Sequence, residues 1–93
     1  MSDIVIKIDQ KTFRTIKQLT AVNDHGGAYL LAAQTLGLTS LAERFERINR
    51  QHLAHGHLPI DLYQERFVAY QELLESAQSQ MSTADYQRFY HLF

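Results

Sequence analysis

Three closely spaced histidines, His52, His55 and His57, could hold a metal ion. Imidazole nitrogens bind zinc, copper and nickel, and the first two residues would share one side of a helix. A fourth ligand is needed, and Asp61 is the nearest carboxylate. Histidines near a helix C-terminus are also favourable without a metal, because they interact with the helix dipole and its free carbonyls. We therefore predict no metal and no cofactor, with His52 partly buried and hydrogen-bonded.

The pair Asp24-His25, followed by Gly26-Gly27, could act as an acid and a base in a flexible loop. No nucleophile stands at a usable spacing, and two glycines do not make a phosphate-binding loop. The chain has no cysteine, which excludes thiolate metal sites and cysteine nucleophiles and fits a reducing compartment. We expect a plain turn here, no catalytic residues, and a protein that is not an enzyme.

Length and charge limit the remaining function classes. A chain of 93 residues predicts a single domain, residues 1–93. The net charge of −1 gives no global attraction for nucleic acid or for anionic membranes. The N-terminus lacks the features of a signal peptide, and no apolar run reaches the ~20 residues that cross a bilayer. These features predict a cytoplasmic protein without a membrane partner.

The hydrophobic periodicity predicts a mainly all-α fold, a compact bundle of four to five helices. The β-branched residues 4–8 favour a short N-terminal β-strand, although they could also begin a longer helix. Asp9 is placed to cap a first helix. Residues 23–27 indicate a break, and a second, central helix is expected from about Ala28 to Leu36, ending at Gly37.

A third helix is expected after a capping box formed by Ser40 and Glu43. Its apolar face contains Leu41, Phe45, Ile48 and His52. The pairs Glu43–Arg47 and Glu46–Arg50 have the favourable i,i+4 order and indicate a solvated face. Gly56 marks the end of this helix.

Residues 29–48 resemble the DNA-binding helix-turn-helix pattern at Ala33, Gly37 and Leu38. That family needs apolar residues at two positions of its second helix which are Glu43 and Glu46 here. Burying two unpaired carboxylates is costly, and glutamates directed at phosphates oppose nucleic-acid binding. We therefore interpret this segment as two ordinary helices joined by a glycine turn.

The order of elements in residues 1–36 loosely resembles that of ribbon-helix-helix proteins, which bind DNA as dimers through paired strands. Val5 and Lys7 would face the DNA groove, and only Lys7 could form a hydrogen bond with a base edge. A dimeric DNA-binding regulator of this kind, or with a degenerate helix-turn-helix, is the alternative hypothesis. Nucleic acid is nevertheless not the partner we expect.

The fourth helix carries the longest apolar stripe, which requires another helix to cover it. A capping box of Asp61 and Gln64 is expected to begin this helix, and Ser82 to cap a final aromatic one. The residues of the stripe are Tyr63, Phe67, Tyr70, Leu74, Ala77 and Met81.

Acidic residues accompany this stripe along one side of the fourth helix. Such carboxylates beside tyrosines suit a basic protein partner, because charge steers the encounter and aromatic side chains anchor the complex. The predicted partner-binding residues are Asp61, Glu65, Glu72, Glu75, Tyr63 and Tyr70. The most concrete hypothesis is a small immunity or antitoxin protein that inhibits a basic toxin or nuclease. The N-terminal strand or the C-terminal aromatic segment could in addition support a homodimer.

Overall fold

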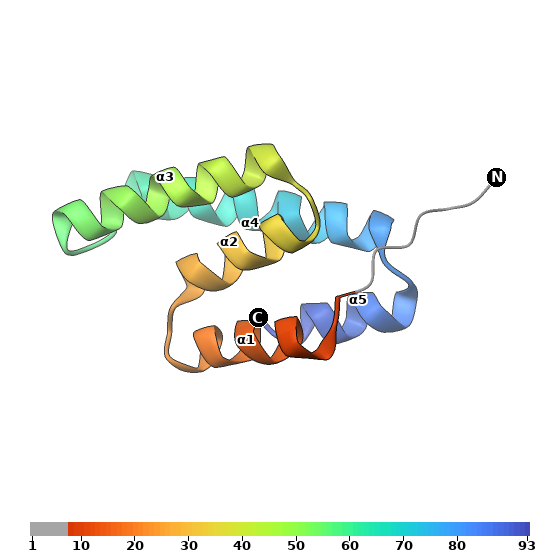
Figure 1. Cartoon of the computed structure of the whole chain (residues 1–93). Helices are drawn as coiled ribbons and strands as arrows, with labels where there is room; N and C mark the ends of the chain where they lie inside the picture. Colours follow the sequence, from red (N-terminus) through yellow and green to blue (C-terminus); the bar gives the residue numbers. More distant parts are fainter. Residues whose placement is uncertain (1–7) are drawn as a thin grey trace.

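Five α-helices joined by short connections form the computed structural model, which describes residues 8–93 (Figure 1). The helices are α1 (Gln10–Ala21), α2 (His25–Thr35), α3 (Thr39–His55), α4 (Ile60–Gln80) and α5 (Thr83–Tyr90). Residues 8–93 contain no strand. The all-α prediction is confirmed. The proposed strand at residues 4–8 lies outside the described residues except for Ile8, which is buried and has no regular structure.

The central helix is α2, as expected. It runs between an antiparallel pair formed by α3 and α4 and a second layer that contains α1 and α5 (Figure 1). Its most extensive packing is with α3, followed by α1. The paired helices α3 and α4 extend past the other layer at the end where they connect. The fold is therefore elongated, with principal extents of 46 × 25 × 16 Å.

Side-chain caps begin three of the helices. The Asp9 carboxylate accepts a hydrogen bond from the Thr12 amide at 2.7 Å, and the Ser82 hydroxyl accepts one from the Asp85 amide at 3.2 Å, as predicted. Asp24 accepts from the Gly27 amide at 2.9 Å. This third cap corrects the predicted start of α2, because the helix begins at His25 and includes both glycines. The break is confined to residues 22–24.

Both predicted capping boxes are wrong. The N-cap of α3 is Leu38 and that of α4 is Pro59, and neither helix has a side-chain cap. Ser40 and Asp61 instead lie inside the first turns. Local backbone geometry explains the earlier starts: the Leu38 amide donates to the Ala33 carbonyl at 2.9 Å and closes the preceding turn. Pro59 has a fixed φ of −57°, which directs the chain into α4 without a side-chain hydrogen bond.

Glycine ends α2 and α3 as predicted. Gly37 and Gly56 both have a φ of +72°, the left-handed conformation that other residues adopt at a cost. These two positions set the corners between α2 and α3 and between α3 and α4.

The core combines a few large side chains with many alanines. The largest fully buried side chains are Phe45, Phe89, Ile16, Ile48 and Leu73. Ala28, Ala32 and Ala33 on α2 are completely buried, so this helix can approach its neighbours closely. The C-terminal segment closes the core with Phe89, whereas Tyr90 remains 51% exposed. The aromatic residues of this segment are therefore divided between the core and the surface.

Candidate partner-binding surface

The connected ends of α3 and α4 form a projection that we call the hairpin tip, residues 49–68. None of its described side chains is fully buried. Burial in α3 stops at Ile48 and resumes in α4 at Ala69. Figure 1 shows the reason: α1, α2 and α5 do not extend over this end of the hairpin. The two helices of the tip cover only one another.

The burial of the apolar stripe of α4 differs on the two sides of this boundary. Ala77 and Met81 are buried, and Tyr70 and Leu74 are half-buried against the core. Tyr63 and Phe67, in contrast, are 57% and 55% exposed. The prediction that another helix covers the stripe is thus wrong for its first half. The cause is the position of α2, which begins beside Asn49 and leaves the tip uncovered.

Exposed apolar side chains concentrate on the tip. Ile60 is 78% exposed and lies three and seven residues before Tyr63 and Phe67, so these three share a helix face. Leu53 and Val68 are also exposed. Ile60 was not among the predicted partner-binding residues, although its spacing from Tyr63 extends the stripe. Outside the tip, the exposed large hydrophobic residues among the described residues are Val22 and Tyr90.

Tyr70 belongs to an aromatic cluster between α2, α4 and the C-terminus. Its ring stacks on Tyr29 with centroids 4.7 Å apart and meets Phe93 edge-on at 5.8 Å. Burial of the phenol raises the pKa of Tyr70 to about 12, and the pKa of Tyr29 is also raised by burial. Of the two tyrosines predicted to bind a partner, Tyr63 is therefore the more accessible.

Tyr63 also takes part in a cation–π contact with Arg66 at the base of the tip. The Arg66 guanidinium lies 5.4 Å from the centroid of the Tyr63 ring and 6.0 Å from that of Tyr29. These cation–π contacts link an exposed ring to the buried cluster. They hold Tyr63 against α4 and limit the number of side-chain conformations that a binding partner would have to restrict.

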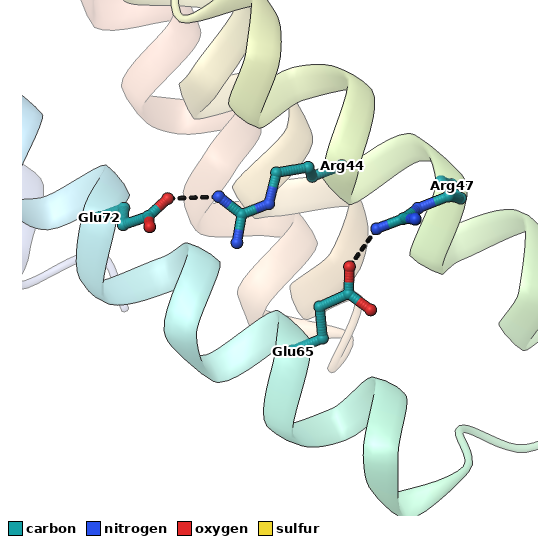
Figure 2. A network of polar contacts seen from close by, with 4 residues as sticks. All are labelled: Arg44, Arg47, Glu65 and Glu72. Atoms are coloured by element: carbon teal, nitrogen blue, oxygen red, sulfur yellow. Dashed lines mark hydrogen bonds and ion pairs between the residues drawn. The ribbon is translucent and has the colours of Figure 1, made fainter.

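Two of the predicted acidic residues already have cationic partners. Figure 2 shows that Glu72 pairs with Arg44 and Glu65 with Arg47, so the two ion pairs connect α3 with α4. The expected Glu43–Arg47 pair is therefore wrong, because Arg47 reaches across to the neighbouring helix. The expected Glu46–Arg50 pair is confirmed.

Asp61 and Glu75 are exposed and form no ion pair within the described part of the chain. Asp61 lines a shallow hollow of 370 Å³ together with Glu65 and Arg47. Glu75 and Glu72 line another hollow, of 390 Å³, beside Ser40 on the far part of α4. The predicted site residues thus divide into two groups. Asp61, Tyr63 and Glu65 lie on the tip, whereas Tyr70, Glu72 and Glu75 lie beyond it.

The histidines occupy the end of α3 and the following loop. His52 is exposed, so its prediction as a partly buried residue is wrong: the buried face of α3 ends one turn earlier, at Ile48. Among the residues whose side chains are described, no group of three potential ligands is arranged to hold a metal.

The residues on which the two DNA-binding hypotheses depend lie in different surroundings. Glu43 is exposed on α3, as expected for two ordinary packed helices. The three arginines of α3, Arg44, Arg47 and Arg50, are each engaged by a glutamate. Such pairing reduces the positive charge that this helix could offer to phosphates. Val5 and Lys7, required by the ribbon-helix-helix hypothesis, lie outside the described residues.

Comparisons with protein-family models, curated proteins and solved structures gave no match to this chain. Within the described residues, no helix combines the length and apolarity that crossing a membrane requires.

Proposed function

We propose that this chain is a non-enzymatic protein-binding module whose contact surface is the hairpin tip. The observation that carries the proposal is the exposure of Ile60, Tyr63 and Phe67 on one face of α4. Isolated apolar residues on a surface need no explanation, but three at helical spacing leave a contiguous stripe in water. A partner that covers the stripe would complete the burial that α2, α3 and α5 provide for the second half of α4.

The hairpin tip combines an apolar stripe with carboxylates on another side of α4. Aromatic side chains supply large contact areas at a small entropy cost, and Tyr63 is already held by Arg66. The carboxylates of Asp61 and Glu65 lie one turn apart on a different side of α4, where they line a hollow together with Arg47 of α3. A cationic residue of a partner could bind Asp61 directly and could compete with Arg47 for Glu65. The partner we propose is therefore a basic protein.

The concrete form of this proposal is an inhibitor of the immunity or antitoxin kind, which would neutralise a basic toxin or nuclease in the cytoplasm. Small size and a projecting contact surface fit that task, because an inhibitor must cover the active site of its target. The carboxylates of the tip would favour rapid association with a cationic target.

The test is affinity capture from the source cells with the wild-type chain and with a Tyr63→Ser/Phe67→Ser variant. We expect the wild type to retain a basic protein whose toxic or nuclease activity it inhibits, and we expect the variant to lose both effects. Tyr90→Ser is the matched control, because Tyr90 is similarly exposed on α5.

Equal retention by the wild type and the tip variant would contradict the proposed surface. Retention without inhibition would contradict the inhibitor function. Tight, salt-dependent binding to duplex DNA would instead support the alternative of a DNA-binding regulator.

A further inference from the structure

A groove of about 730 Å³ runs between α1 and α5, in the layer of the molecule away from α3 and α4. Phe13, Arg14, Lys17, Ala21, Arg88 and Leu92 are among the residues that line it. The two helices do not pack extensively on one another. An open channel therefore remains where a bundle would otherwise bury side chains.

Cations line this groove without any carboxylate. Arg14 and Lys17 project from α1 and Arg88 from α5, and none of the three forms an ion pair within the described residues. The arginines of α3 differ, because each of them has a glutamate partner. The electrostatic character of the groove is therefore positive, although the whole chain has a net charge of −1.

The floor of the groove is apolar. Phe13 is 7% exposed, and the Arg88 guanidinium lies over its ring, 4.5 Å from the centroid. Leu92 is half-buried and packs against the core. A ligand that fits must therefore combine negative charge with an apolar group. This combination disfavours a nucleic-acid backbone, which presents phosphates but no aliphatic group for the floor.

We propose that the groove between α1 and α5 binds a short acidic segment of a protein partner. An apolar side chain of that segment would pack on Ala21 and Leu92, and its carboxylates would approach Arg14, Lys17 and the Arg88 guanidinium that covers Phe13. An amphipathic helix that places its apolar face in a groove is a common mode of peptide recognition. This site is independent of the hairpin tip, because it has the opposite charge and is formed by different helices.

The test is an NMR titration of the full chain with a designed peptide as long as α1, 12 residues. The peptide carries leucine at helical i, i+3, i+4 and i+7 spacing and glutamate elsewhere. We expect amide shifts confined to α1, α5 and the C-terminus. The same peptide with lysine in place of glutamate should cause no such shifts. Shifts centred on α3 and α4 would overturn the proposal.

Two charge reversals on one helix give the decisive comparison. Lys17→Glu should weaken peptide binding by about tenfold or more, since it replaces an attraction with a repulsion inside the groove. Lys11→Glu makes the same change of charge on an exposed residue outside the groove lining and should have a much smaller effect. Equal weakening by both variants would show that binding depends on overall charge alone and would contradict the site.

Other occupants would give different results. Tighter binding of a duplex DNA oligonucleotide than of the peptide, at equal ionic strength, would overturn the assignment of a protein partner. Shifts at α1 and α5 that depend on protein concentration without any peptide would identify a second copy of this chain as the occupant. A well-dispersed spectrum of Lys17→Glu would establish that loss of binding does not arise from unfolding. Arg14→Gln, also at an exposed position, is the second variant if the first fails to fold.

Discussion

The ring of Tyr29 on α2 stacks on the ring of Tyr70 on α4, with the two planes inclined by 24°. The stack lies where the covered part of α4 meets the uncovered hairpin tip. It joins the N-terminal end of the central helix to the middle of the longest one, and Phe45 and Phe93 complete its surroundings. Aromatic pairs of this geometry add about 0.5–1.5 kcal/mol beyond their buried area.

Alkaline pH should destabilise the fold through this stack. Burial raises the pKa of Tyr70 from 10.0 to about 12, so the folded chain keeps a proton that the unfolded chain releases near pH 10. The unfolded state therefore binds fewer protons above that pH, and the free energy of unfolding falls as pH rises from 10 towards 12. Thermal melts across this range should show the decline, and tyrosinate absorbance should report at least one late-titrating phenol.

A Tyr70→Phe variant is the control for that pH dependence. It keeps the ring and removes the titrating hydroxyl, so the alkaline decline in melting temperature should become shallower. Tyr29 still contributes, because its pKa is raised as well. An unchanged pH profile in the variant would assign the alkaline loss to other groups.

Truncation of a phenylalanine should cost more stability in the core than on the hairpin tip. Phe45→Ala empties a fully buried position and should lower the free energy of unfolding by about 3–5 kcal/mol. Phe67→Ala removes a side chain that is 55% exposed and should cost well under half of that. Urea denaturation of both variants measures the contrast. Similar losses would mean that another element covers Phe67 in solution.

The effect of alanine at Gly26 should depend on the residue at position 49. A Cβ atom on Gly26 would lie 2.2 Å from Oδ1 of Asn49, so Gly26→Ala forces the Asn49 side chain out of its position. Helix propensity favours alanine over glycine by roughly 0.5–1 kcal/mol. We expect Gly26→Ala to be more favourable for stability in an Asn49→Ala background than in the wild-type chain, where the Asn49 side chain has to move. A double-mutant cycle by thermal denaturation measures the coupling free energy between positions 26 and 49. Additive effects of the two substitutions would argue against close contact between these positions.

Exchanging the partners of one ion pair should restore stability. Glu65→Arg places two cations together between α3 and α4, and we expect a loss of up to about 1 kcal/mol because the site is partly exposed. Adding Arg47→Glu reverses the pair and should recover most of the loss. Chemical denaturation at low and high salt provides the measurement. The effect should shrink with salt, and a salt-independent loss would indicate a change in packing instead.

Periodicity in the sequence predicted the helices and most of the core. Phe45 and Ile48 on α3 and Ala77 and Met81 on α4 are buried as expected, because a face that repeats every three or four residues has to be covered. Helix starts were less predictable. Asp9 and Ser82 cap as expected, whereas Ser40 and Asp61 do not, because the backbone turns before each of them begin the helices earlier.

The candidate site was harder to predict, because it depends on where neighbouring helices end. The sequence shows that Tyr63 and Tyr70 share a stripe, but only the start of α2 beside Asn49 decides which ring stays exposed. Similarly, i,i+4 spacing could not reveal that Arg47 reaches Glu65, since the two residues are distant in sequence. The basic groove joins α1 to α5 from opposite ends of the chain, and no local pattern indicates it.

The uncovered hairpin tip also has a consequence for local unfolding. Its backbone hydrogen bonds are protected by few buried side chains, so residues 49–68 should open without disrupting the rest of the molecule. Amide hydrogens there would exchange with solvent well before those of α2, which is enclosed between two layers. A partner that binds this segment would have to restrict its motion, at a cost in affinity, while the segment could adjust to the shape of that partner. The proposed contact surface would then be the least stable part of the fold.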